Sequence, residues 1–520
     1  MPITGDTVGS RVAAAARDTP WLVAGEPTSA AALDAAADRV AGGLLGTGLE
    51  PGEHVCLLLR TSPTALVTWF ALARAGLVEV PLNTATRGGL LAHLLEHSGA
   101  RVVVADADLA PLVLAARPPS VTRVIVHGGD PPPDPPPGVT VSRWAELAVA
   151  APPERQVAVD PDDTTVVLYT SGTTGPPKGV RLSHRANLAL AEHTVDLMSY
   201  TAADRLYSVF PLFHSNARFC SVLPALLTGA GLVLDARFSA SGFWDTCRTH
   251  GITAFNFQGA MLTLLHQRPE TPADADNPVR AGFGAPCPPE VTPSFERRFG
   301  VELTEVYGST EVSIVCQARP HERRPGSAGR ESPLYHCRVV DDRGDPVPSG
   351  VSGEIVARPK RAGLMFSGYH AMPDATVRAW RDLWFRTGDR GRMDGDGHLY
   401  FLDRLSDSIR RRGENVSSWE IERALVALPD VAAAAAYGIA SALSEEDVMV
   451  AVVPAQEARI DPADLVGRLR EAVSGFALPR YVRVVDALPL TPSQRTEKYR
   501  LRAEGVTPET WDREAERDER

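Results

Sequence analysis

Apolar residues in the first part of the chain follow two spacings, one typical of helices and the other of buried strands. Residues 30–45 and 64–75 carry apolar side chains three to four positions apart, which predicts amphipathic helices. Short, mostly apolar runs at 54–59, 76–80 and 101–105 predict buried strands. Strands that alternate with helices form parallel sheets covered by those helices, so the pattern predicts an α/β structure.

Farther along the chain the pattern changes. The helix–strand alternation continues through apolar runs at 231–234 and 252–256. From about residue 327 it gives way to runs at 335–340 and 353–357 around the acidic turn 341–345. Short strands around tight turns are typical of antiparallel pairing, so we expect a small barrel-like β part here.

A second change near residue 403 sets a small C-terminal module apart. Its pattern predicts two helices and three strands, at 418–428 and 461–474 and at 431–437, 448–453 and 481–485. This mixture indicates a small α+β domain of roughly 110 residues, which is an ordinary domain size. We therefore predict an α/β protein with two domains, residues 1–402 and 403–520.

Composition narrows the class of protein. The 520 residues are 44% hydrophobic and 22% charged, which is typical of a globular chain. A net charge of -11 without a long basic stripe argues against a nucleic-acid partner. No apolar run reaches 18 residues, and the N-terminus lacks the apolar stretch of a signal peptide. Six scattered cysteines without a C-x-x-C pair indicate reduced thiols, so we expect a cytoplasmic protein without a membrane partner.

Residues 168–180 have the sequence LYTSGTTGPPKGV and carry the strongest chemical signal. A predicted strand at 165–169 leads into hydroxyl and glycine residues that end on one cation. Glycines let backbone N–H groups approach an anion, hydroxyls add donors, and a lysine adds a point charge for phosphate. The candidate phosphate-binding residues are Thr170, Ser171, Gly172, Thr173, Thr174, Gly175 and Lys178. Two prolines between Gly175 and Lys178 distinguish the loop from a Walker A motif.

A second candidate nucleotide motif, TEVYGSTE, occupies residues 304–311. An aromatic ring can stack on a base, hydroxyls can donate to phosphate, and a carboxylate can bind Mg²⁺. Alone, this string also fits an ordinary exit from a strand into a turn. After the first loop, its candidate residues are Tyr307, Gly308, Ser309, Thr310 and, as metal ligand, Glu311.

The two motifs together resemble those of the adenylate-forming superfamily, which includes acyl- and aryl-CoA ligases, peptide-synthetase adenylation domains and luciferases. The resemblance spans about residues 15–505. The stretches FHSNARFCSVLPALLTGA and DADNPVRAGFGA are similar to the branch of crotonobetaine/carnitine-CoA ligases. It implies a large N-terminal region and a small, mobile C-terminal lid that rotates between adenylation and thiol transfer.

The resemblance also implies roles for individual residues. Tyr307 would face the adenine beside the turn Gly284-Ala285-Pro286, Thr310 the α-phosphate and Glu311 the magnesium. Thr387-Gly-Asp389 matches the ribose site, with Asp389 as hydrogen-bond acceptor. In the segment that matches the inter-domain hinge, Arg404 would touch the ribose or the α-phosphate. Ser406 stands there in place of the usual aspartate or lysine.

By the same resemblance, the acceptor pocket would be lined by His214, Asn216, Arg218, Gln258 and Gly284. Relatives often carry glutamine at the position of Arg218. A cation there would suit an anionic substrate, and a structural ion pair is an equally good explanation.

The largest departure from the family lies near the C-terminus. Relatives end in L-P-R-T-x-x-G-K, and that lysine bridges the substrate carboxylate and the α-phosphate. Here Gln494 and Arg495 replace the glycine and the lysine. Arginine keeps the charge but presents a broad planar fork. Arg495 and Lys498 are both candidates for the missing catalytic group, alongside Lys178 and Glu311 elsewhere.

Residues 93–97, H-L-L-E-H, match the pattern of inverted zinc peptidases. On a helix, His93 and His97 would share one face. The resemblance places an ordinary surface helix here, and the sequence offers no third ligand. We therefore reject a zinc site.

Three functions remain. The first is an acyl- or aryl-CoA ligase that uses ATP, Mg²⁺ and CoA: an oxyanion attacks the α-phosphate, expels pyrophosphate, and the mixed anhydride passes to a thiol. The second is a diazotase that activates nitrite and transfers the nitrosyl group to an aryl amine. The third is a nucleotide-binding protein without ligase activity. The presence of Lys178, Glu311, Asp389 and Arg404 argues against the third.

Overall fold

The computed structural model describes residues 6–153, 157–170, 177–405, 409–411, 414–416, 418–441, 446–456, 458–470, 472–473, 475–490 and 496–515. These residues form two compact units. The larger unit contains the described residues of 6–170, 177–336 and 358–380, and the smaller unit those of 337–357 and 381–515. The smaller unit also takes in strands that precede residue 403, so the domain boundary at that residue stays a prediction.

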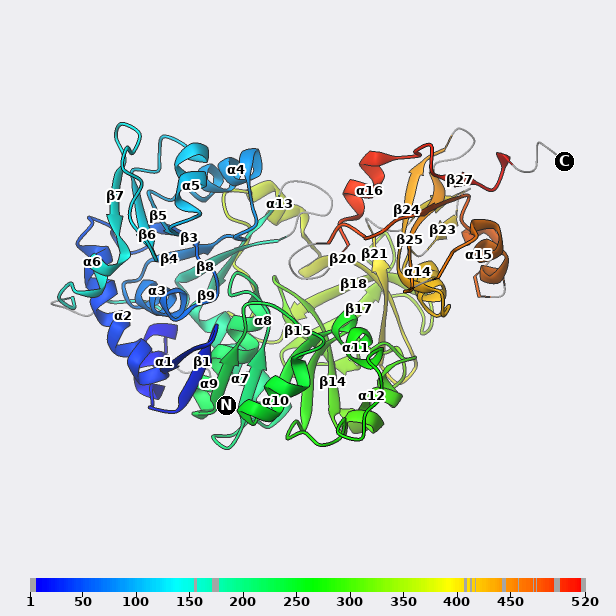
Figure 1. Ribbon diagram of the computed structural model, residues 1–520, viewed down its shortest axis with the longest axis horizontal. Coiled ribbons are helices and arrows are strands. Elements are labelled where there is room, and N and C mark those ends of the chain that lie inside the picture. The colour runs from blue at the N-terminus through cyan, green and yellow to red at the C-terminus, as the bar shows by residue number, and fades with distance from the viewer. Residues whose placement is uncertain are drawn as a thin grey trace. The chain divides into compact units, whose positions relative to one another are not determined.

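One sheet of the larger unit has seven strands, which lie between residues 54 and 183 (Figure 1). Its strands, in the order β7-β6-β5-β3-β4-β8-β9, are β3 (His54–Leu58), β4 (Val78–Pro81), β5 (Val102–Asp106), β6 (Arg123–His127), β7 (Thr140–Arg143), β8 (Thr164–Tyr169) and β9 (Gly179–Ser183). All pairs are parallel except β8 with β9. The strands predicted at 54–59, 76–80 and 101–105 are thus confirmed as β3, β4 and β5.

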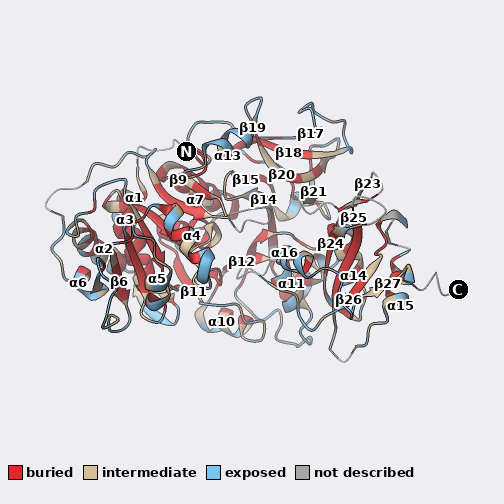
Figure 2. Cartoon of the chain, turned by 90° about the horizontal axis from the view of Figure 1, so that it is seen from above, coloured by how far each residue is buried: buried red, intermediate tan, exposed pale blue. Residues whose placement is uncertain are grey.

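Helices cover both sides of this sheet. The helices α2 (Ala30–Leu45), α3 (Pro63–Arg74) and α6 (Trp144–Ala148) lie on one side, and α4 (Gly88–Ser98) and α5 (Ala110–Ala116) on the other (Figure 1). The α3 helix begins where the Ser62 hydroxyl accepts the amide of Ala65, with Pro63 in the first turn. Apolar strand residues between the two helix layers are buried, as the red strands of Figure 2 show.

The other sheet of the larger unit has nine strands. Its order is β16-β15-β14-β13-β12-β10-β11-β1-β2, with parallel pairing from β1 through β14 and antiparallel edges. The strands are β1 (Pro20–Val23), β2 (Glu26–Ser29), β10 (Arg205–Ser208), β11 (Gly231–Leu234), β12 (Ala254–Gln258), β13 (Ala281–Ala285), β14 (Glu302–Ser309), β15 (Ser313–Ala318) and β16 (Arg330–Glu331). The apolar run predicted at 252–256 forms β12, two positions later.

The remaining helices of the larger unit connect these strands. They are α1 (Val8–Ala15), α7 (His184–Met198), α8 (Ser215–Ala217), a π-helical turn at Arg218–Val222, α9 (Leu223–Thr228), α10 (Phe243–His250), α11 (Gly259–His266), α12 (Thr292–Phe299), a 3-10 turn at Pro320–Glu322 and α13 (Pro373–Arg378).

The smaller unit contains the β part that the sequence predicts. Five strands pair in the order β17-β18-β20-β19, with β21 also paired to β20: β17 (Tyr335–Val340), β18 (Ser352–Pro359), β19 (Trp380–Arg381), β20 (Trp384–Met393) and β21 (Leu399–Arg404). Residues 335–336, 358–359 and 380 of these strands belong to the larger unit. The turn at 341–345 closes around the Asp341 carboxylate, which accepts three backbone amides.

The C-terminal α+β module completes the smaller unit. Its four-stranded sheet has the order β24 (Val431–Ala440), β25 (Glu446–Pro454), β26 (Tyr481–Val484) and β27 (Trp511–Asp512). The other elements are β22 (Ile409–Arg411), β23 (Glu414–Val416), α14 (Ser418–Val426), α15 (Pro462–Leu469), a 3-10 turn at Gly475–Ala477 and α16 (Lys498–Glu504). The helix predicted at 461–474 ends at Leu469, whose carbonyl accepts the amides of Ala472 and Val473 in a closing turn. The predicted α/β class with a separate α+β module is confirmed.

Within the described part of the chain, no helix is both long and apolar enough to cross a membrane.

Candidate active site

The phosphate loop connects two paired strands. β8 ends at Tyr169 and β9 begins at Gly179, and the amide of Thr170 donates to the carbonyl of Lys178 at 3.0 Å. This bond closes the stem of the loop at the end of the seven-stranded sheet. Ser171, Gly172, Thr173, Thr174 and Gly175 lie outside the described residues, so their phosphate contacts stay predictions.

Lys178 lies over an aromatic ring that the sequence analysis did not select. Its Nζ is 5.0 Å from the centroid of the Tyr369 ring, within the range of a cation–π contact. Tyr369 is held there because its segment pairs with β9: the amide of Arg181 donates to Gly368 and that of His370 to Gly179. Among the described residues, Lys178 has no carboxylate partner.

Glu311 follows β14 and contacts the hydroxyl of the same tyrosine. Its carboxylate accepts from the Ser309 hydroxyl at 2.8 Å and from the Tyr369 hydroxyl at 3.0 Å. A Cβ at Gly308 would collide with the carbonyl oxygen of Ser313, so the hairpin that presents Glu311 requires glycine there. A carboxylate that accepts only from neutral hydroxyls within the described residues fits a Mg²⁺ ion, which takes one or two carboxylates together with phosphate oxygens.

The predicted adenine wall lies on two adjacent strands. Gly284 and Ala285 end β13, and Tyr307 is buried in the neighbouring β14. A side chain at Gly284 would strike the carbonyl of Phe257. The carboxylate of Glu305 accepts the amide of Cys287 at 2.9 Å and so fastens the turn at Pro286 to β14. Burial raises the pKa of Glu305 to about 7.

Asn216, one of the predicted pocket residues, belongs to a neutral hydrogen-bonded group. The amide group of Asn256 donates to Asn216 Oδ1 at 2.6 Å and to Ser221 Oγ at 2.7 Å. Gln258 is the last residue of β12, two positions beyond Asn256. The ring of His214 lies 4.7 Å from that of Phe213, centroid to centroid.

Arg218 forms the ion pair that the sequence left open. Its side chain is 1% exposed and its guanidinium binds both carboxylate oxygens of Glu79 on β4. The guanidinium also stacks 3.8 Å from the Trp69 ring centroid and donates to the Leu212 carbonyl at 3.1 Å. The cavity beside this pair measures about 10 Å³, which holds no more than one water molecule.

The predicted ribose residues lie on adjacent strands of the smaller unit. Asp389 on β20 stands directly opposite Arg404 on β21, and Arg404 Nε is 3.4 Å from Asp389 Oδ1. The Asp389 amide donates to the Thr387 hydroxyl at 3.1 Å, which fixes the Thr-Gly-Asp turn. These contacts place the carboxylate beside a cation, and the ribose role stays a prediction.

Two residues are candidates to replace the missing family lysine. One of them, Lys498, forms a hydrogen bond and an ion pair within the smaller unit. Its Nζ donates to the Ser418 hydroxyl at 2.6 Å and lies 2.8 Å from Glu422 Oε1, joining α16 to α14. Arg495 and the hinge residue Ser406 lie outside the described residues.

Four histidines gather beside the phosphate-loop stem. The rings of His54 and His97 lie 4.6 and 5.5 Å from that of His370, and His93 lies 5.7 Å from His97. His97 Nδ1 is hydrogen-bonded to the hydroxyl of Tyr169, the residue before Thr170, at 2.7 Å. Across the described residues, no three His, Cys, Asp or Glu side chains are arranged to hold a metal. The cluster therefore joins the two ends of the loop stem through ring contacts.

We expect this cluster to make the fold sensitive to acid. Burial, with the nearby His54 and His97 rings and Arg181, lowers the pKa of His370 to about 4. The unfolded chain takes up that proton near pH 6.5, so the free energy of unfolding falls as the pH drops from about 6.5 toward 4 and is unaffected above that range. His370→Gln keeps a donor for the His97 carbonyl without titrating. Urea denaturation at pH 7.5, 6 and 5 should show a shallower acid decline for this variant, and an unchanged slope would contradict the assignment.

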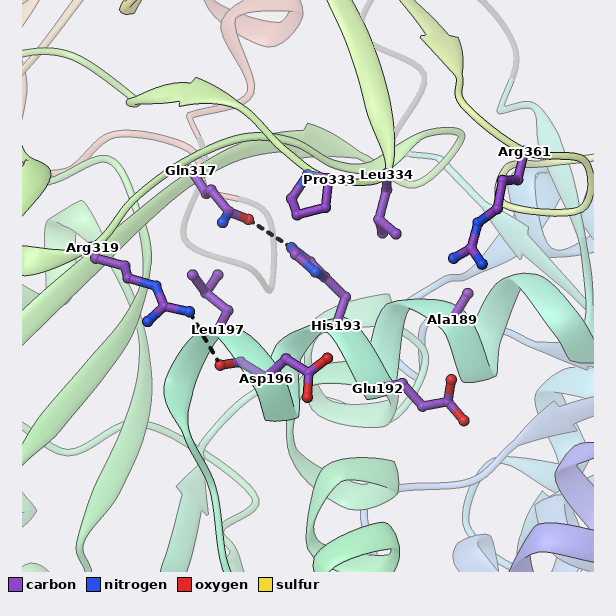
Figure 3. A pocket seen from close by; sticks show the side chains of 10 residues that line it. All are labelled: Ala189, Glu192, His193, Asp196, Leu197, Gln317, Arg319, Pro333, Leu334 and Arg361. Atoms are coloured by element: carbon purple, nitrogen blue, oxygen red, sulfur yellow. Dashed lines mark hydrogen bonds between the residues drawn. The ribbon is translucent and has the colours of Figure 1, made fainter. Parts of the chain in front are cut away.

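One surface cavity, of about 180 Å³, contains none of the predicted site residues. It lies between α7 and β15, and its lining mixes acidic, basic and apolar side chains (Figure 3). His193 Nε2 donates to Gln317 Oε1 at 2.6 Å across it, and Arg319 donates to the Asp196 carbonyl at 3.4 Å. The predicted site residues thus do not line this cavity.

The fold and the paired nucleotide motifs define an adenylate-forming enzyme. Residues 10–370 match the family of AMP-binding enzymes, and residues 420–495 match the family of AMP-binding enzyme C-terminal domains. The chain therefore belongs to the AMP-binding enzyme family, and the resemblance inferred from its motifs is confirmed.

CoA ligases are among the proteins similar to this chain. The sulfoacetate–CoA ligase of Cupriavidus necator is 31% identical over 512 residues, covering 96% of this chain and 98% of the relative. The crotonobetaine/carnitine–CoA ligase of Salmonella typhi is 31% identical over 481 residues, covering 91% and 93%. ATP-bound MatB from Rhodopseudomonas palustris is 28% identical with a TM-score of 0.83 over 95% of this chain and 98% of that one. An anthranilate CoA ligase in complex with anthranoyl-AMP shares the fold, with a TM-score of 0.85 at 21% identity over 97% of this chain and 98% of that one.

Proposed function

We propose that the protein is an ATP-dependent carboxylate–CoA ligase whose acid carries an uncharged acyl or aryl group. The observation that carries this is the contact of Tyr369 with both Lys178 and Glu311. In the described part of the chain, Lys178 has no anion and Glu311 no cation as partner. A phosphate supplies the first partner and Mg²⁺ the second.

The chemistry follows from charge. The substrate carboxylate attacks the α-phosphorus of ATP in line, and the bond to the bridging oxygen of pyrophosphate breaks. Lys178 stabilises negative charge on the phosphate oxygens during this step, as preorganised cations do in phosphoryl transfer. The CoA thiolate then attacks the acyl carbon of the anhydride, and AMP leaves. Mg²⁺, which Glu311 would hold, neutralises phosphate charge when bound.

The acid is proposed to have an uncharged body because Arg218, the one arginine among the predicted pocket residues that the structure describes, is already paired with a carboxylate. Glu79 already neutralises Arg218, and the adjacent space is too small for an organic acid. Asn216 and Gln258 are neutral hydrogen-bonding groups. Arg218 therefore supports the pocket wall, through its bond to Leu212, and is not the site of a second anion. Two sequence features are compatible with nitrite, a small anion: the replacement of the family lysine by Arg495 and the added cation Arg218. The pairing with Glu79 removes the second of them.

Pyrophosphate release tests the proposal. The assay combines ATP with benzoates, short acyl acids, dicarboxylates or nitrite, each with and without CoA, and nitrite also with an aryl amine. Thioester formation from an uncharged acid supports the proposal. Turnover only with dicarboxylates would overturn the substrate class, and CoA-independent turnover with nitrite would overturn the ligase. Nucleotide binding without turnover across the panel would indicate a protein that has lost ligation.

Arg495 is proposed to take the place of the missing lysine. The chain has three lysines. Lys360 pairs with Glu331 at 2.6 Å and Lys498 with Glu422 at 2.8 Å, so using Lys498 for catalysis would first cost the bond between α14 and α16. We expect Arg495→Ala to slow pyrophosphate release by about 100-fold, the effect of losing one charged donor at a transition state.

Two variants control this experiment. Arg495→Lys retains a cation and should preserve much of the rate. Lys498→Ala should lower the free energy of unfolding. It should have a smaller effect on the rate of adenylation than Arg495→Ala. A rate lost with Lys498→Ala and kept with Arg495→Ala would reverse the assignment.

A further inference from the structure

Tyr369 contacts both of the opposite charges of the candidate site. Its ring lies against the Lys178 ammonium, with 5.0 Å from Nζ to the ring centroid. Its hydroxyl donates to Glu311 Oε1 at 3.0 Å. Lysine is a flexible cation, and a carboxylate within reach is its most favourable partner in a partly buried site. Instead, both groups contact the same neutral side chain.

The tyrosine is fixed by backbone bonds on two sides. The amide of Arg181 donates to Gly368 at 3.1 Å and the amide of His370 donates to Gly179 at 2.7 Å, which ties the segment to β9. The amide of Phe366 donates to the carbonyl of Glu311 at 2.9 Å, which ties the same segment to the β14–β15 hairpin. Tyr369 is therefore anchored to the strand after Lys178 and to Glu311 itself.

We propose that Tyr369 is a positioning residue that keeps Lys178 and Glu311 from pairing with each other before the nucleotide binds. The ring blocks the ion pair and offers the ammonium a weaker contact that phosphate can displace. The hydroxyl orients the carboxylate. Without the ring, we expect Lys178 to fold onto Glu311, so that nucleotide and metal would each have to break an ion pair. The role of Tyr369 in catalysis rests on the proposed function, whereas its test requires only that the protein binds nucleotide.

Calorimetric binding of α,β-methylene-ATP in EDTA measures whether Lys178 is available, without metal and without turnover. Tyr369→Phe keeps the ring and should bind within about threefold of wild type, because it loses one neutral-donor hydrogen bond on Glu311 only. Tyr369→Leu removes the ring and should weaken binding about tenfold or more, since a charged contact is lost. Adding Glu311→Gln to Tyr369→Leu should restore most of that loss, because the glutamine no longer captures the lysine.

Tyr335→Leu is the matched control. Tyr335 is a fully buried tyrosine of the same unit whose hydroxyl donates to the Leu364 carbonyl at 2.6 Å. Any loss of nucleotide binding in this variant reflects packing and should not be restored by Glu311→Gln. The proposed positioning role of Tyr369 is overturned if Glu311→Gln fails to restore nucleotide binding in Tyr369→Leu, or if it restores binding equally in both tyrosine variants. Absence of nucleotide binding by the wild type would overturn this inference and the proposed function together, whereas binding without ligation would overturn the proposed function alone.

Discussion

Lys178→Ala is expected to lower kcat/KM for ATP-dependent pyrophosphate release by about 100- to 1,000-fold, which corresponds to the loss of one preorganised charge at a transition state. Of the three lysines, it is the one for which the described residues supply no carboxylate. Its ammonium is therefore available to phosphate, and the Thr170–Lys178 backbone bond holds it at the mouth of the loop. Pyrophosphate exchange with the preferred acid measures the effect.

Lys360→Ala is the control for this prediction. Lys360 pairs with Glu331 at 2.6 Å and donates to the Ser332 carbonyl at 2.9 Å, so its removal deletes a lysine from the same unit. A partly exposed pair of this kind contributes little to stability. We expect the exchange rate of Lys360→Ala to stay within about twofold of wild type. Full activity of Lys178→Ala would show that another group binds the phosphates.

The sequence was sufficient for those parts of the fold that local patterning determines. The run at 54–59 became β3 and the pattern at 30–45 became α2, because the spacing of apolar residues determines which of the two structures can bury them. The limits of α15 were less predictable. A closing turn at Leu469, which no periodicity marks, ends that helix five residues early.

Contacts between distant residues were not accessible from the sequence. Tyr369 lies 191 positions after Lys178, and only the pairing of its segment with β9 brings the two together. The string FSGYH offered a weak signal, a tyrosine directly after a glycine. In the structure, the φ of that glycine, Gly368, is 119°. Similarly, Glu79, the ion-pair partner of Arg218, lies far away in the sequence on β4. The sequence alone therefore could not distinguish an ion pair of Arg218 from a contact with the substrate.

Glu79→Gln is expected to lower the free energy of unfolding by about 3–5 kcal/mol, the typical cost of leaving one partner of a buried ion pair uncompensated. Both side chains are at most 2% exposed, so water cannot replace the lost carboxylate oxygen. Arg218 would keep its contacts with Trp69 and the Leu212 carbonyl but lose its counter-charge. Urea denaturation followed by tryptophan fluorescence measures the change.

The double variant Glu79→Leu with Arg218→Met separates the charge effect from packing. Replacing both members of a buried pair by apolar groups of similar size is often neutral or stabilising, so this variant should be more stable than Glu79→Gln. It also removes the donor to Leu212, two residues before His214, and should therefore raise KM for the acid while KM for ATP stays unchanged. If the double variant is as unstable as Glu79→Gln, packing around Trp69, and not an unpaired charge, determines the cost. If KM for the acid does not change, Arg218 has no part in shaping the pocket wall.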